Sequence, residues 1–159
     1  MSAFRPIFSS LIAAGCLLAV ADEPSKLWID TYSKMAAAMG KSDVSAYMAF
    51  LDKSFVYANH GKETKLDEYK KLLGTFLTSF TDVKTTIVPL KVTKKGDTLL
   101  ITHHYTFTGT SHGKDGTTKV LRFFQDGTDT WVSVKGRYLQ TREEVEKEGL
   151  MPGPPKGAG

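Results

Sequence analysis

Residues 98–108 read TLLITHHYTFT, and this stretch decides the class of fold. Its β-branched and aromatic side chains alternate with polar ones, as in a strand that has one buried face. Ile101, His103, Tyr105 and Phe107 share one face, and His104 lies on the other. We expect the more aromatic face to point inward, which puts His103 inside the protein and His104 outside.

The segments on either side repeat this strand-like pattern. β-branched and aromatic residues recur, with turn-forming glycines between the segments, in residues 83–93, 118–124 and 137–141. A long helical pattern returns only from Glu143. The second half of the chain is therefore predicted to form an antiparallel sheet.

Two positions leave details of this sheet open. Pro89 indicates an edge position or a β-bulge, because proline cannot donate a hydrogen bond to a neighbouring strand. Asp126-Gly127 fits either a hairpin turn or a bulge in one long strand that ends at Val134.

The first half of the chain follows a helical period instead. Apolar side chains recur every three or four residues in segments 25–40, 43–51 and 64–80. Asp43 is the expected N-cap of the second helix, and Thr64 with Asp67 matches a capping box for the third. Residues 55–59 predict a short strand that ends in a turn at Asn59-His60-Gly61.

The N-terminus predicts a cleavable signal peptide over residues 1–21. Arg5 precedes an apolar run, and Ala19-Val20-Ala21 has the small-residue pattern of a cleavage site. The run is too short for a stable membrane span. We therefore expect a secreted or periplasmic protein, with one domain at residues 22–150 and a disordered Pro- and Gly-rich tail at 151–159.

The only cysteine, Cys16, lies inside this leader. Residues 13–16 resemble a lipoprotein box, which would make the mature protein a lipoprotein, but the residues that follow stay apolar. Cleavage after Ala21 would leave a chain without a thiol, and so without disulfides or zinc–cysteine sites. The net charge of +4 comes from scattered lysines, which does not indicate a nucleic-acid surface.

Helices followed by long antiparallel strands are the order of elements expected of an α+β fold. Within it, three blocks of sequence carry a family resemblance: Phe55-Val56-Tyr57 with Gly61 and Glu68-Tyr69; Gly96-Asp97-Thr98; and Thr128-Asp129-Thr130-Trp131-Val132 before Gly136-Arg137-Tyr138. On these residues, most of the stretch 26–142 resembles the nuclear transport factor 2-like superfamily, in its SnoaL-like and ketosteroid-isomerase-like branch.

The resemblance implies a cone-shaped roll, in which a curved, mostly antiparallel sheet wraps around the N-terminal helices and leaves a pocket. It also implies a homodimer. Members of the superfamily include isomerases, dehydratases, cyclases, epoxide hydrolases and proteins without any chemistry, so function has to be argued from the site. In the isomerase branch an Asp base would follow the first strand, but Asn59 stands there and cannot take a proton.

One hypothesis for the site is acid–base chemistry. His103 would act as general base or acid, and Asp129, which shares a face with Trp131, would orient it or stabilise its charge. The alternative is structural: His103 is then a hydrogen-bonded strand residue and Asp129 a surface or turn carboxylate.

The remaining pocket candidates are Tyr57, Asn59, Tyr105, Arg122 and Trp131. Tyr57 and Tyr105 could donate hydrogen bonds to an oxyanion. Arg122 would either bind an anionic ligand or lie at the surface, and Trp131 would either stack on a ligand or fill the core.

No cofactor and no metal site are expected. The adjacent His103 and His104 face opposite ways, and His60 and His112 lie in predicted turns without a ligand at metal-binding spacing. Two functions then remain open. The first is an exported, non-catalytic protein that binds a small apolar or aromatic ligand or serves as a dimeric interaction module. The second is a cofactor-free lyase, isomerase or hydrolase that uses His103 and Asp129.

Overall fold

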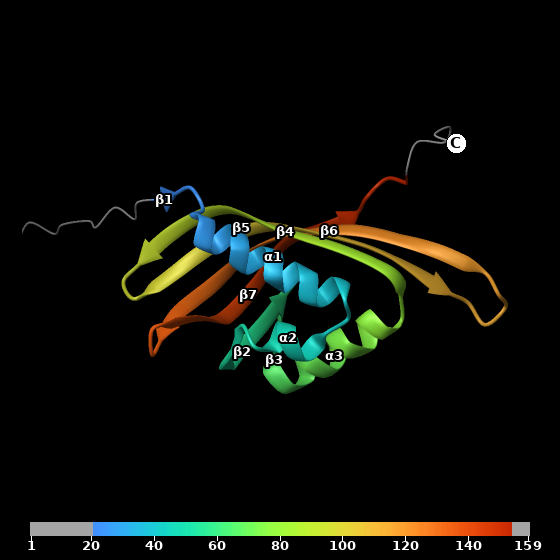
Figure 1. The fold of residues 1–159 in the computed structure, drawn as a ribbon, viewed down its shortest axis with the longest axis horizontal. Coiled ribbons are helices and arrows are strands. Elements are labelled where there is room, and N and C mark those ends of the chain that lie inside the picture. Colours follow the sequence, from blue (N-terminus) through green and yellow to red (C-terminus); the bar gives the residue numbers. More distant parts are fainter. Residues whose placement is uncertain (1–20, 154–159) are drawn as a thin grey trace, which may run out of the picture.

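The computed structural model describes residues 21–153, and Figure 1 shows the helices of this part of the chain gathered against a curved sheet. The predicted leader, Cys16 included, lies outside the described residues except for Ala21. No helix in the described part of the chain is long and apolar enough to cross a membrane.

Seven strands of the described chain form one sheet in the order β1-β4-β5-β6-β7-β2-β3. The strands are β1 (Ala21–Asp22), β2 (Leu51–Asn59), β3 (Lys62–Lys65), β4 (Thr81–Lys95), β5 (Thr98–His112), β6 (Thr118–Val134) and β7 (Arg137–Leu150). All neighbours pair antiparallel except β2 and β7, which are parallel. The expected α+β roll is confirmed.

The helices are α1 (Lys26–Gly40), α2 (Val44–Met48) and α3 (Leu66–Thr78). Asp43 caps α2, because its carboxylate accepts the backbone N–H of Ala46 at 2.9 Å. The capping box predicted for α3 is wrong. Thr64 is paired in β3, and the chain enters the helix through Lys65 without a side-chain cap.

The strand β5 confirms the predicted alternation. Ile101, His103, Tyr105 and Phe107 are all buried, whereas His104 is partly exposed. Pro89 lies at a bulge, since the register of β4 against β5 shifts between Pro89 and Lys91.

The Asp126-Gly127 pair lies within one long strand, β6, and not in a hairpin turn. The irregularity is on the partner strand: Asp126 pairs with Lys147 and Gly127 with Val145, so Glu146 is an extra residue in β7.

The last part of the chain differs from the sequence prediction. The helical pattern from Glu143 is instead the continuation of β7, which runs to Leu150. A second bulge lies just before this segment: Thr130 pairs with Arg142 and Trp131 with Gln140, so Thr141 is unpaired. The bulge turns both Gln140 and Glu143 inward, three residues apart, as a helix would.

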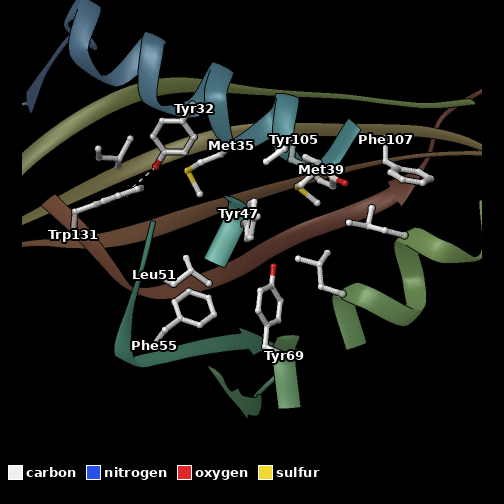
Figure 2. Close-up of a cluster of buried hydrophobic side chains, with 14 of the residues drawn as sticks. Tyr32, Met35, Met39, Tyr47, Leu51, Phe55, Tyr69, Tyr105, Phe107 and Trp131 are labelled. Atoms are coloured by element: carbon white, nitrogen blue, oxygen red, sulfur yellow. Dashed lines mark hydrogen bonds between the residues drawn. The ribbon is translucent and has the colours of Figure 1, made fainter. Parts of the chain in front are cut away.

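The core lies between the helices and the concave face of the sheet. Its fully buried side chains include Trp131, Tyr32, Phe55 and Phe107, which come from both layers (Figure 2). The helix α1 is also tied to β4 by a hydrogen bond of 2.7 Å from the Thr85 hydroxyl to the Ala36 carbonyl. Helices and sheet therefore share one packed interior.

Two glycines should respond in opposite ways to alanine. A Cβ on Gly127 would lie 2.6 Å from the Glu144 carbonyl oxygen and 3.2 Å from His103 Cε1, so Gly127→Ala should destabilise the fold by about 1–3 kcal/mol. A Cβ on Gly74 in α3 would meet only Val44 Cγ2 at 3.9 Å, so Gly74→Ala should stabilise by up to about 1 kcal/mol. Urea unfolding of both variants tests the contrast, and equal effects would contradict the steric role of Gly127.

Candidate functional site

A cavity of about 220 Å³ lies between the helices and the concave face of the sheet. The helices supply mainly apolar side chains to its wall: Met35, Met39, Leu73 and Phe76. Five tyrosines also line the cavity: Tyr32, Tyr47, Tyr57, Tyr69 and Tyr105. The wall is therefore aromatic and apolar, with a small number of polar groups in it.

The ionisable groups in the wall come from three neighbouring strands. His103 is on β5, Asp129 on β6 and Glu143 on β7. They are 4%, 2% and 8% exposed. Strand alternation points His103 and Asp129 inward, and the bulge at Thr141 does the same for Glu143.

A buried chain of hydrogen bonds fixes Asp129. The Tyr32 hydroxyl donates to Asp129 Oδ2 at 2.6 Å, and Trp131 Nε1–H donates to the Tyr32 oxygen at 3.0 Å. Figure 2 shows the second of these bonds, with Tyr32 reaching from α1 toward Trp131 on the sheet. These hydrogen bonds hold Asp129 Oδ2 and leave Asp129 Oδ1 without a hydrogen-bond partner among the described residues.

His103 and Asp129 lie close together without a hydrogen bond between them. The distance from His103 Nδ1 to Asp129 Oδ2 is 3.3 Å, but the angles at these two atoms are not those of a hydrogen bond. Four buried polar atoms in the cavity wall therefore lack a partner within residues 21–153: His103 Nδ1, Tyr105 Oη, Asp129 Oδ1 and Glu143 Oε2.

Burial sets the protonation of this cluster. It raises the pKa of Asp129 to about 8, against the side chains of Tyr32 and Gln140, which lower it. Burial and the nearby Asp129 raise the pKa of Glu143 to about 8. Burial also lowers the pKa of His103. At neutral pH the site without a ligand therefore holds mainly protonated carboxyl groups beside a neutral imidazole.

Two kinds of chemistry are open to such a cluster. A protonated carboxyl group can donate a proton and a neutral imidazole can accept one, which are the two halves of acid–base catalysis. One ligand atom from each of His103, Asp129 and Glu143 also lies within 4.8 Å of the others, close enough for the three residues to share a metal ion.

The structure brings together four of the residues selected from the sequence. Tyr57, His103, Tyr105 and Asp129 all line the cavity. His104 is on the outer side of β5, with its side chain 40% exposed and its Nδ1 2.6 Å from Asp126 Oδ1. Because Asp129 is buried within β6, the structural alternative for this residue, a surface or turn carboxylate, is wrong.

Three of the selected residues lie elsewhere. Asn59 lines a second hollow that shares Tyr57 with the cavity, and its amide there donates to Glu148 Oε2 at 3.3 Å. Arg122 donates to the Pro152 carbonyl at 3.1 Å and does not reach the cavity. Trp131 belongs to the core and acts on the site only through its bond to Tyr32.

Sequence reasoning missed Tyr32 and Glu143. Tyr32 lies on the apolar stripe of α1, and a helical period predicts that such a residue is buried without indicating what its hydroxyl group contacts. Glu143 lay beyond the predicted end of the last strand. Residues 143–149, EEVEKEG, contain a single apolar side chain and so show no alternation, and their composition fits a charged helix.

Comparison with known proteins identifies the fold. No protein-family model matches the chain, and no curated protein matches it. Among solved structures, a conserved protein from Planctomyces limnophilus is similar, with a TM-score of 0.63 and 11% identity over 74% of this chain and 90% of that one.

Two further structures agree with this likeness. Aln2 from a Streptomyces species has a TM-score of 0.55 and 18% identity, over 79% of this chain and 94% of its own. A Caulobacter vibrioides protein described as having a cystatin-like fold has a TM-score of 0.54 and 14% identity, over 75% of this chain and 83% of its own. Identities this low reveal a shared fold and not a shared activity. The chain shares its α+β fold with these proteins, and this is the fold class that the resemblance to the nuclear transport factor 2-like superfamily implied.

Proposed function

We propose that the protein binds a small, largely apolar or aromatic molecule in the cavity between helices and sheet. The observation that carries this proposal is the set of buried polar atoms without partners in an otherwise aromatic wall. Leaving a buried donor or acceptor unpaired costs roughly 1–3 kcal/mol, so four such atoms around one space favour a bound molecule that pairs with them.

The size and charge of the cavity narrow the class of ligand. A volume of about 220 Å³ is larger than a cavity of roughly 150 Å³ that accommodates benzene, so a molecule with one or two rings fits. No lysine or arginine is among the described residues that line the cavity, and two carboxyl groups are. A neutral ligand with a hydroxyl or carbonyl group therefore suits the wall better than an anion.

A second candidate function is cofactor-free acid–base catalysis by His103 and Asp129. The observation that favours it is the buried pair itself: a carboxyl group with a raised pKa lies 3.3 Å from an imidazole with a lowered one. Environments that keep an acid protonated and a base neutral at the same pH are typical of lyase and isomerase sites. Glu143 would then be a second acid in the same site.

Export and dimer formation complete the proposal. Cleavage of the leader would place the domain outside the cytoplasm, as a secreted or periplasmic protein. A homodimer would cover apolar side chains that are exposed on the sheet, among them Val88, Leu90 and Val120 at 48%, 55% and 61% exposed.

Filling the cavity should abolish ligand binding. Leu73 is a buried wall residue on α3, so Leu73→Trp adds an indole to the space that a ligand would occupy. With 2-naphthol as the probe, we expect the affinity measured by calorimetry to fall at least about tenfold. The proposal predicts saturable binding to the unaltered protein, and it fails if neutral one- and two-ring aromatic alcohols do not bind.

The matched control is Leu27→Trp. Leu27 is an exposed leucine on α1, outside the cavity, so the same substitution there should leave the affinity unchanged. Circular dichroism checks that both variants fold. Equal loss of binding in the two variants would place the probe somewhere other than the cavity.

The acid–base candidate predicts how stability depends on pH. Folding holds the protons of Asp129 and Glu143 up to about pH 8, whereas the unfolded chain releases them near pH 4. The stability that these groups contribute is therefore full below about pH 4 and is lost progressively as the pH rises to about 8, by roughly 1 kcal/mol per pH unit for each carboxyl group.

We expect the free energy of unfolding, measured with a chelator present, to fall between pH 7 and pH 8. His103, whose pKa is lowered, stays neutral in the folded protein over this range and adds little to the change. Asp129→Asn should make the dependence shallower, while Asp115→Asn, at an exposed position where hydrogen bonds from Thr117 lower the pKa of the carboxyl group, should not. An Asp129→Asn profile identical to that of the unaltered protein would mean that Asp129 is ionised in the folded state.

The proposed export has a direct test. If the leader is removed after Ala21, the intact mass of the exported protein will correspond to a chain that begins at Asp22. A mass that corresponds to lipid attached at Cys16, or to the uncleaved chain, would contradict the proposal.

A further inference from the structure

The buried cluster of His103, Asp129 and Glu143 has a composition that a hydrophobic core does not require. Each side chain offers an atom type that binds metal ions, and one such atom from each lies within 4.8 Å of the other two. The three residues come from the adjacent strands β5, β6 and β7. Sites built on strands are held more precisely than sites on loops, and β5, β6 and β7 are paired with one another.

The atoms that would bind an ion are free. His103 Nδ1, Asp129 Oδ1 and Glu143 Oε2 are buried and have no hydrogen-bond partner in the part of the chain that the structure describes. Each residue is more than nine-tenths buried, so bulk water does not explain the missing partners. This observation is independent of the clustering, because residues can lie close together and still pair with other groups.

The distances are compatible with a small divalent ion. Two ligands at about 2.1 Å from a tetrahedral zinc ion are about 3.4 Å apart. The distance from His103 Nδ1 to the nearer oxygen of Asp129, the Oδ2 that also accepts from Tyr32, is 3.3 Å. With all ligand atoms within 4.8 Å, closure on an ion needs only small rotations of the side chains.

The charge of the cluster also suits a cation. The described residues that are buried include two carboxyl groups but no lysine or arginine. Without a cation such carboxyl groups stay protonated, because an ionised carboxylate is costly to bury alone. One divalent ion would let both groups ionise and would balance their two charges, and the neutral imidazole would add the third ligand.

The surroundings of the cluster resemble the support that metal ligands need. Tyr32 donates to Asp129 Oδ2 at 2.6 Å and is itself fixed by Trp131 at 3.0 Å. Gly127, opposite His103 in the sheet, leaves room for the imidazole: a Cβ there would lie 3.2 Å from His103 Cε1. Groups of this kind orient the ligands of a metal ion.

We propose that His103, Asp129 and Glu143 bind a divalent first-row transition metal ion such as Zn²⁺, with an open coordination position toward the cavity. One nitrogen and two oxygen ligands suit such an ion better than Mg²⁺ or Ca²⁺, which prefer oxygen ligands alone. Three protein ligands and one open position are typical of sites where an ion contacts a bound molecule. The inference goes beyond the proposed binding of a neutral aromatic ligand and does not depend on it.

The test is a titration of the untagged, chelator-stripped mature protein. We expect calorimetry to give one equivalent of Zn²⁺ per chain, and Co²⁺ in its place to give visible d–d absorption bands of a site with low coordination number. Glu143→Gln and His103→Gln should each weaken Zn²⁺ binding at least about tenfold. Excess Mg²⁺ should not displace Zn²⁺.

The chain offers two matched controls. His104→Gln removes the adjacent histidine, which contacts its own carboxylate on Asp126, and Glu148→Gln removes an exposed carboxylate from the same strand as Glu143. Both should keep one equivalent of Zn²⁺. Loss of binding in His104→Gln with retention in His103→Gln would assign the ion to the surface and overturn the proposal.

The outcome is decisive even if the buried variants do not fold. In that case the Co²⁺ bands are measured in the His104→Gln chain, which leaves the core untouched. Absence of a saturable band, or of stoichiometric Zn²⁺ binding, overturns the metal site and leaves the binding of 2-naphthol unaffected. Failure of 2-naphthol to bind would leave the metal result standing, so the two proposals fail separately.

Discussion

The hydrogen bond from the Tyr32 hydroxyl to Asp129 joins the two layers of this fold. It links α1 to β6 across 97 residues of sequence and lies in the fully buried part of the core. Because Trp131 donates to the same hydroxyl oxygen, three side chains fix each other. A buried network that is satisfied in one arrangement opposes sliding of the helix along the sheet, which a purely apolar contact would allow. The position of α1, and with it the helical wall of the cavity, depends on this network.

The same network explains why the cavity has a polar end. Asp129 is held by one oxygen and presents the other, together with His103 and Glu143, to the enclosed space. Folding has to overcome the desolvation of these groups, whatever their protonation state. Proteins keep buried polar groups that reduce stability where those groups have a function, and both proposals assign a function to this cluster. An aromatic ligand would fill the apolar part of the cavity, and a metal ion would occupy the cluster itself. The two occupants would touch at the open coordination position.

The β-bulges decide which side chains take part. In a regular strand, Gln140 and Glu143 would point to opposite faces, because they are an odd number of residues apart. The unpaired Thr141 shifts the phase of β7, so both point inward and Glu143 joins Asp129, its partner across the ladder. The other bulge of β7, at Glu146, lies beside Gly127, where the backbone of β7 comes too close to admit a Cβ. Irregularities of the sheet therefore build the site, as they do in other curved sheets.

The sequence by itself determined the elements that depend on local chemistry. The period of apolar residues located three helices, the Asp43 cap and the inward face of β5, and so predicted His103 inside and His104 outside. Family resemblance then supplied the curved sheet that wraps around the helices. Local pattern failed where pairing with distant residues decides the outcome. Thr64 joined β3 instead of capping a helix, and residues 143–150 extended β7 because β6 and β2 were there to pair with them. Only the tertiary structure brought Glu143 to His103 and Asp129, and only it put Arg122 and Asn59 outside the cavity. The physical reason is that a one-residue bulge reverses which face a side chain takes, and the sequence does not mark where a partner strand will force one.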